Sequence, residues 1–198
     1  MYKLKKKIAV LLCFVVMLVI FPTNVFAEED NNEYVSLYLN WDNELKEYTR
    51  NLCEEEDISY TLVLAIFYNE SRFDDKATSR YGNTINYGLG QINGNRTALK
   101  FFRDKGLIKN EEDLLDPKTN IACCVEILKY YKDVGDELDM LYCYQNGEGT
   151  WKLTSPVKIE KDALLNRVVE MQTKYDNVID LEEDLESVNV EYEDAEED

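Results

Sequence analysis

Glu70 stands near the end of a mostly apolar segment, within the stretch "FYNESRF" of residues 67–73. Burying an ionised carboxylate is costly unless the group is paired or protonated, so this position needs an explanation. Apolar neighbours, the C-terminal end of a predicted helix, and the like charges of Asp74 and Asp75 should all raise the pKa of Glu70. A carboxyl that stays protonated near neutral pH is the general acid that glycosidic bond cleavage requires. The structural alternative is a glutamate that points into solvent at a helix end.

Histidine is absent from the sequence, and this narrows the chemistry that the chain can perform. Serine or cysteine nucleophiles activated by histidine are excluded, as are zinc sites with histidine ligands. No CxxC spacing indicates another metal site, and no cofactor is expected. Proton transfer therefore falls to carboxylates. The 198 residues, 45% of them hydrophobic, suffice for one folded core.

The first 27 residues have the features of a secretory signal peptide. Four lysines precede an apolar run over residues 8–21, and small residues lead to a predicted cleavage site after Ala27. The run is shorter than the roughly 20 residues that a spanning helix needs, although an uncleaved membrane anchor is the alternative. We therefore expect a protein secreted to the extracellular cell-wall space, with membrane contact only through this segment. Residues 28–40 are interpreted as a linker.

Acidic residues dominate the charge of the chain. The formal net charge is −18, and removal of the four lysines in residues 1–27 would make it −22. Nucleic acid is therefore excluded as a partner. The last 19 residues, 180–198, contain eleven acids and no lysine or arginine. This composition predicts a disordered acidic tail beyond a folded domain at residues 41–179.

Four cysteines follow the predicted signal peptide: Cys53, Cys123, Cys124 and Cys143. Secretion permits disulfides, and four cysteines allow three pairings. The adjacent pair Cys123 and Cys124 lies in an apolar stretch, where small buried thiols are ordinary core residues. Buried thiols and one or more disulfides therefore both remain open.

Helical periodicity dominates the mature chain and predicts an all-α or mostly α fold. Asp42 and Ser59 are suited to cap two successive helices, the second of them apolar nearly all round. Asp116 followed by Pro117 marks the start of another helix. Residues 77–97 are rich in Gly, Asn, Ser and Thr, which predicts an irregular loop or a short hairpin.

Short motifs follow Glu70 in a characteristic order. They are ESRF at 70–73, Ser79, GLGQIN at 88–93, DPKTNIACCVEIL at 116–128 and YQNGEG at 144–149. Together they resemble the soluble lytic transglycosylase (SLT) family of lysozyme-like proteins, over about residues 58–175. The resemblance implies a goose-type, lysozyme-like helical domain in which the loop or hairpin segment lines a cleft.

The resemblance also implies which residues form the active site. Glu70 matches the catalytic acid/base of the family. The positions that match substrate-binding residues are Ser71, Ser79, Gln91, Asn93 and Tyr144. Without the motifs, the two amides would be interpreted as loop-stabilising groups, and Tyr144 as a core residue whose hydroxyl binds a backbone carbonyl.

The sequence also departs from the family pattern. Gly90 stands where Met is common, Cys123 and Cys124 replace an Ala-Gly pair, and Gln145 replaces Asn. The loop between the matching Ser and Gln is about three residues longer than the common form. These changes affect substrate contacts and leave the acid in place.

The implied function is cleavage of the MurNAc-β-1,4-GlcNAc bond of peptidoglycan with formation of 1,6-anhydro-MurNAc ends, by a single acid/base. The expected partner is the peptidoglycan glycan strand, and the expected state is a monomer. One alternative is a hydrolytic muramidase of the same fold, with Asp74 or Asp75 as the second carboxylate. Another is a catalytically inactive glycan-binding protein of the cell wall.

Overall fold

The computed structural model describes residues 33–147 and 163–196, together with residues 152, 154 and 158. The predicted signal peptide lies outside these residues. The chain divides into two compact units, Met1–Ser36 and Leu37–Asp198, and the described residues 33–36 of the first unit are helical. The second unit carries all of the predicted site residues.

The second unit begins at Leu37, before the predicted domain start at residue 41. The reason is Tyr38, which is only 1% exposed and whose ring packs edge-on against Tyr175, with 5.9 Å between ring centroids. The Tyr38 hydroxyl also donates a hydrogen bond to Glu182 Oε2 at 3.0 Å. The end of the predicted linker is therefore part of the folded unit.

Two helices follow the helical residues 37–39 at the start of this unit, and both begin at the predicted caps. Helix α3, Asn43–Glu56, is capped by Asp42, whose carboxylate accepts from Leu45 N at 3.0 Å. Helix α4, Tyr60–Ser71, is capped by Ser59. Every side chain of α4 from Leu62 to Tyr68 is buried, as its apolar sequence predicts.

A small antiparallel sheet follows α4. Its strands are β1 (Thr78–Tyr81), β2 (Thr84–Tyr87) and β3 (Ile92–Asn93), in the order β1-β2-β3. Gly82, with φ of 59°, occupies the tight turn between β1 and β2, where a left-handed conformation favours glycine. The short hairpin is therefore confirmed, and the third strand adds to it.

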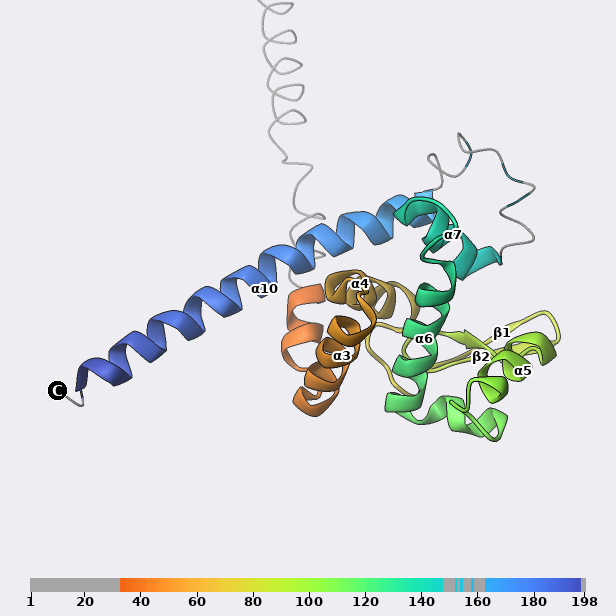
Figure 1. Ribbon diagram of the computed structural model, residues 1–198, viewed down its shortest axis with the longest axis horizontal. Coiled ribbons are helices and arrows are strands. Elements are labelled where there is room, and N and C mark those ends of the chain that lie inside the picture. Colours follow the sequence, from red (N-terminus) through yellow and green to blue (C-terminus); the bar gives the residue numbers. More distant parts are fainter. Residues whose placement is uncertain (1–32, 148–151, 153, 155–157, 159–162, 197–198) are drawn as a thin grey trace, which may run out of the picture. The chain divides into compact units, whose positions relative to one another are not determined.

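The remaining short helices bring the motifs back toward the sheet. They are α5 (Arg96–Asp104), the 3₁₀ helix η1 (Glu111–Leu115), α6 (Pro117–Tyr131) and α7 (Glu137–Asn146). Asp116 caps α6 and proline occupies its first turn, as predicted. Helix α6 packs against α3, η1 and α7, and contacts β3 as well (Figure 1).

The last helix, α10 (Ala163–Glu196), packs along α4 (Figure 1). It continues through residues 180–196, where the acidic composition predicts disorder. The backbone of this segment is helical instead. Residues 163–196 contain no glycine or proline, and glutamate is a good helix former, so nothing in the sequence ends the helix early.

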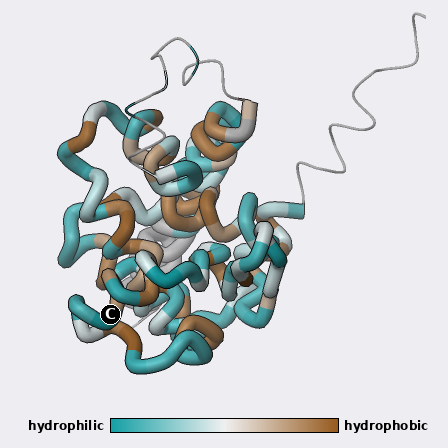
Figure 2. Tube along the Cα trace, turned by 90° about the vertical axis from the view of Figure 1, so that its right-hand side faces the viewer, coloured by the Kyte–Doolittle hydropathy of each residue, from teal (hydrophilic) through white to brown (hydrophobic). Residues whose placement is uncertain are grey.

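The core of the unit combines apolar helix faces with a cluster of aromatic rings. Phe73 lies 5.1 Å from Trp41 and 6.1 Å from Tyr175 between ring centroids, and Trp41 also packs against Phe67 at 5.8 Å. Figure 2 shows hydrophobic stretches alternating with hydrophilic ones along the trace. The fold is mostly α-helical, as predicted.

The four cysteines of the described residues, Cys53, Cys123, Cys124 and Cys143, are free thiols and all are buried. Of the two alternatives left open by the sequence, the structure therefore has buried thiols. Within the described ranges, no helix combines the length and apolar composition that crossing a bilayer requires.

Candidate active site

Glu70 is the second-last residue of α4 and is partly buried. Burial raises the pKa of its carboxyl, and a hydrogen bond from Asn69 Nδ2 to Oε1, at 3.5 Å, opposes this shift. Asp74 and Asp75 make no contribution to the shift, so the expectation that they raise this pKa is wrong. Asp74 accepts a hydrogen bond from the Lys76 backbone N–H at 2.9 Å instead.

The helix ends sharply behind Glu70. Arg72 and Phe73 both have left-handed backbone conformations, with φ of 56° and 61°. Phe73 is nevertheless buried in the aromatic cluster. Two consecutive left-handed residues without glycine are unfavourable, so ring packing must compensate for the backbone strain. The carboxyl is thus held on the end of a rigid, buried helix.

Tyr144 lies on α7. Its hydroxyl donates a hydrogen bond to Gly90 O, in the loop between β2 and β3, at 2.7 Å. Its hydroxyl end is withdrawn from solvent, and burial raises the pKa of Tyr144 well above its usual value, with smaller contributions from Cys124 and Glu70. Glu70 also raises the pKa of Cys124, for which burial is again the main cause. Glu70 therefore interacts electrostatically with both Cys124 and Tyr144.

Gln91 follows Gly90 in a left-handed conformation, with φ of 46°. Its side-chain Nε2 donates to Gly88 O at 3.0 Å and to Ala77 O at 3.3 Å, and its Oε1 accepts from Ser79 Oγ at 2.7 Å. The amide therefore ties the loop to strand β1. Ser79 itself is exposed.

Asn93 and Ser71 also make internal hydrogen bonds. Asn93 Nδ2 donates to Asn86 Oδ1 at 2.6 Å and to Thr84 Oγ1 at 3.1 Å, so it joins strands β2 and β3. Ser71 Oγ donates back to Phe67 O, one turn earlier in α4, at 3.1 Å. Both side chains hold the local backbone in place.

Asn120 of α6 is a site residue that the sequence analysis missed. It is completely buried, and its Oδ1 accepts from Gly90 N at 2.9 Å. Its Nδ2 donates to Tyr87 O at 2.7 Å and to Leu114 O at 2.8 Å. The available signal was an amide at the start of the mostly apolar run "NIACCVEIL", because buried amides need several partners.

Gly88 shows why the loop needs glycine beside Asn120. Its φ is 66°, and a Cβ at this position would lie 2.5 Å from Asn120 Nδ2. A side chain there would be strained by the backbone and would displace the amide that holds the loop. Asn120 and the glycines therefore fix the path of the chain from β2 to β3.

The arrangement is suited to proton transfer by one carboxyl. In the part of the chain that the structure describes, no other carboxylate contributes to the pKa shift of Glu70. Within the same residues, no group of three or more His, Cys, Asp or Glu side chains is placed to hold a metal ion. The residues around Glu70 supply a partly buried acid, a neutral hydroxyl and a tightly bonded loop.

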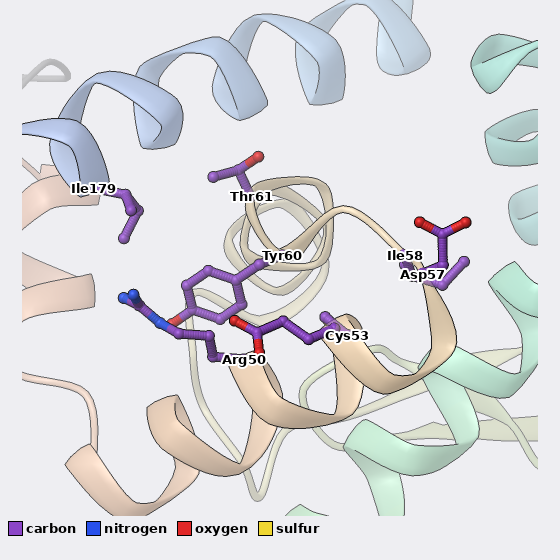
Figure 3. A pocket seen from close by; sticks show the side chains of 8 residues that line it. Arg50, Cys53, Asp57, Ile58, Tyr60, Thr61 and Ile179 are labelled. Carbon is purple, nitrogen blue, oxygen red and sulfur yellow. The ribbon is translucent and has the colours of Figure 1, made fainter. Parts of the chain in front are cut away.

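A cavity of about 280 Å³ lies elsewhere, between α3, the start of α4 and α10 (Figure 3). Arg50, Tyr60 and Ile179 are among its lining residues, and Arg50 Cζ lies 5.1 Å from the centre of the Tyr60 ring. None of the predicted site residues lines it. The cavity belongs to the packing of these helices and is separate from the surroundings of Glu70.

Comparison with known proteins identifies one family. The model of the transglycosylase SLT domain matches residues 47–163. Among solved structures, the chain is similar to an inactive mutant of the lytic transglycosylase Slt from Pseudomonas aeruginosa, with 18% sequence identity and a TM-score of 0.46. The match covers 65% of this chain and 21% of that one, so the chain spans about a fifth of that structure's length. No curated protein matches the chain.

Proposed function

The chain belongs to the transglycosylase SLT domain family, and on this premise we propose that it is a peptidoglycan lytic transglycosylase with Glu70 as its single acid/base. The observation that carries the proposal is the position of Glu70. It lies within the matched segment, on a buried helix, and burial raises its pKa. A carboxyl in such surroundings is suited to donate a proton near neutral pH.

The proposed reaction has two proton transfers. Glu70 first protonates the glycosidic oxygen between MurNAc and GlcNAc, and the bond from that oxygen to MurNAc C1 breaks. The resulting carboxylate then accepts the proton of the MurNAc C6 hydroxyl, whose oxygen forms the new bond to C1. The product is a 1,6-anhydro-MurNAc end, and Glu70 regains its proton. Because the nucleophile belongs to the substrate, no water has to be positioned.

The surroundings of Glu70 favour this reaction over hydrolysis. Inverting and retaining hydrolases of the common kind use a second carboxylate about 5–9.5 Å from the acid. Asp74 and Asp75, the two candidates from the sequence, are not among the causes of the pKa shift of Glu70. Asp75 instead pairs with Lys76 at 3.3 Å. An intramolecular nucleophile removes the need for that second group.

The other predicted site residues enter the proposal with distinct roles. The bonded amides of Gln91 and Asn93 shape the wall on which sugar N-acetyl groups would lie. We infer that the exposed Ser79 contacts a sugar directly. Ser71 fixes the end of α4, and Tyr144 forms the wall beside the acid.

The location and partners follow from the same proposal. The substrate is the glycan strand of peptidoglycan, so we expect the domain to work in the extracellular or periplasmic space. We also expect it to be a monomer. Cleavage after Ala27 would release it from its signal peptide. N-terminal sequencing of the exported protein tests this point, and a start at Met1 would favour the uncleaved anchor.

Mass spectrometry of muropeptides released from purified sacculi tests the activity. We expect products that end in 1,6-anhydro-MurNAc, and a release that is about 10²–10⁴-fold slower with the Glu70→Gln variant. Reducing MurNAc ends as the main product would instead identify a hydrolytic muramidase. Binding to sacculi without any release would identify an inactive glycan-binding protein.

A further inference from the structure

We propose that Gly90 is a positioning residue for Glu70, because it directs the single hydroxyl proton of Tyr144 to its own carbonyl and away from the carboxyl of Glu70. Its catalytic consequence rests on the proposed function, whereas the hydrogen bonding is a property of the fold. Tyr144 Oη donates a hydrogen bond to Gly90 O at 2.7 Å. A tyrosine hydroxyl has only one proton to donate, so this bond uses it.

The absence of a side chain at residue 90 makes this bond possible. A Cβ on Gly90 would lie 2.7 Å from Tyr144 Oη, closer than such atoms approach in proteins. It would also lie 3.3 Å from Cys124 Cβ and 3.4 Å from Cys124 Sγ. A methyl group at residue 90 would therefore be enclosed by the hydroxyl on one side and the thiol on the other.

The loop itself has little freedom to yield to such a methyl group. Gly90 N donates to the buried Asn120 Oδ1 at 2.9 Å, and Leu89 is completely buried. Asn120 and Cys124 are four residues apart on α6, so the same helix face holds the loop and closes one side of Gly90. The hydroxyl of Tyr144 is thus the group that has to move.

The acceptor that the displaced Tyr144 hydroxyl binds determines how the displacement affects Glu70. Titratable groups that interact with Glu70 come from two elements packed near it, Cys124 on α6 and Tyr144 on α7. Asn69 is its polar neighbour on α4 itself. In the described residues, no charged group of α3 or α10 contributes to its shift. Glu70 is the carboxyl whose charge acts on Tyr144, so it is the charged acceptor toward which a displaced hydroxyl would turn.

A hydrogen bond from Tyr144 would stabilise the ionised form of Glu70 and lower its pKa. The proposed reaction needs the protonated form, so such a bond would oppose the first step. Gly90 prevents it by keeping the tyrosine proton on a backbone carbonyl. Glycine at this position thereby helps the carboxyl to stay protonated until substrate arrives.

The test is a ¹³C NMR titration of the Glu70 side-chain carboxyl, with its signal assigned by its loss in Glu70→Gln. We expect Gly90→Ala to lower the titration midpoint by about one pH unit, the order of effect of one hydrogen bond to the charged form. The matched control is Gly106→Asn, because a Cβ at Gly106 meets no atom within 4 Å and Asn tolerates its φ of 74°. The control should leave the midpoint unchanged.

The decisive comparison repeats the titration of Gly90→Ala in a protein that also carries Tyr144→Phe. Without the hydroxyl, Gly90→Ala should no longer lower the midpoint. An unchanged midpoint in Gly90→Ala, or an equal fall in the absence of the hydroxyl, would overturn the proposal. If Gly90→Ala does not fold, Tyr144→Phe alone still decides. A rise of about one pH unit in that variant would show that the hydroxyl already donates to Glu70.

Turnover measurements connect the inference to the proposed reaction. In Gly90→Ala, the alkaline limb of the pH profile of kcat should move to lower pH with little change in KM. Above the midpoint, kcat should fall about tenfold, because tenfold less of the acid is protonated after a shift of one pH unit. If the parent protein cleaves no glycan, the proposed function fails, and the titration still decides the role of Gly90.

Discussion

Glu70 and Asp116 are carboxylic acids at opposite kinds of helix end, and their pKa values are displaced in opposite directions. At the C-terminal end of α4, burial raises the pKa of Glu70. At the N-terminal end of α6, hydrogen bonds from Thr119 lower the pKa of Asp116. Thr119 donates to Asp116 Oδ2 twice, from its backbone N–H at 2.9 Å and from its hydroxyl at 2.7 Å.

The supply of hydrogen-bond donors decides what each acid can do. A helix N-terminus presents unpaired N–H groups that stabilise a carboxylate, whereas a C-terminus presents unpaired carbonyls that do not. Asp116 therefore holds structure as an anion. Glu70, with one long hydrogen bond from Asn69, is left able to carry a proton.

Removing the acid at the end of α4 should have the largest effect. Glu70→Gln keeps the shape of the side chain but cannot donate a proton, so we expect the release of soluble muropeptides to fall by about 10²–10⁴-fold. Circular dichroism should show an unchanged fold. A variant that digests sacculi at a rate near that of the parent would contradict the assignment of Glu70.

The same variant should alter the pH dependence of stability. Because folding raises the pKa of Glu70, the folded protein binds this proton more tightly than the unfolded chain does. Its stabilising contribution is present below 4.5, the usual pKa of glutamate, and is lost as the pH rises through the raised value. Relative to the parent, Glu70→Gln should gain Tm at neutral pH and gain less below pH 4.5.

Asn120, one turn into α6, tests how strongly the loop beside the acid is held. Asn120→Leu keeps the approximate volume but leaves Gly90 N, Tyr87 O and Leu114 O without their partner. Each buried group left unpaired costs about 1–3 kcal/mol, so with three such groups the free energy of unfolding should fall by at least about 3 kcal/mol in urea titrations. The exposed Asn177→Leu is the control. A loss no larger than that of the control would show that the loop does not depend on Asn120.

Asp116 should make a smaller contribution, and one that depends on pH. Asp116→Ala removes the cap of α6 and should lower the free energy of unfolding by about 1 kcal/mol at neutral pH. Because the folded pKa is lowered from 3.8, this contribution is present above 3.8 and is lost as the pH falls through the lowered value. Urea titrations at neutral pH and at a pH below the lowered pKa of Asp116 measure this contribution, with the exposed Asp133→Ala as control. An effect that stays constant into acid would show that the charge is not involved.

Shortening α10 should have the smallest effect, provided that the cut lies beyond Glu182. Truncation beyond Glu182 keeps the Tyr38–Glu182 hydrogen bond and should change the free energy of unfolding by less than about 0.5 kcal/mol. Truncation after Val178 also removes the buried Ile179 and should cost about 1–2 kcal/mol. Thermal unfolding of both proteins separates the cases, and equal stabilities would place the domain end before Ile179.

The features that could be predicted from the sequence are those set by neighbouring residues. The caps Asp42, Ser59 and Asp116 were predicted correctly because each bonds an amide three residues away. The burial of α4 followed from its composition. The packing of Tyr38 on Tyr175 could not be predicted, because it joins residues far apart in the chain.

In the candidate site too, features set by neighbouring residues could be predicted, and features that join distant residues could not. The burial that raises the pKa of Glu70 could be predicted from its apolar helix, but the left-handed turn at Arg72 and Phe73 that ends this helix could not. The partners of Gln91 and the role of Asn120 depend on the meeting of the sheet and α6. Side-chain type alone does not specify such partners.

The four buried thiols give the protein an internal reporter of opening. Burial raises the pKa of Cys53 and of Cys123 to about 12, and it raises the pKa of Cys124 further. Only the thiolate reacts with alkylating reagents, so the closed protein should resist them. Modification then requires a transient separation of the helices, and its rate measures how often that separation occurs. Alkylation followed by mass spectrometry would thus compare the opening of α3, α6 and α7 within a single sample.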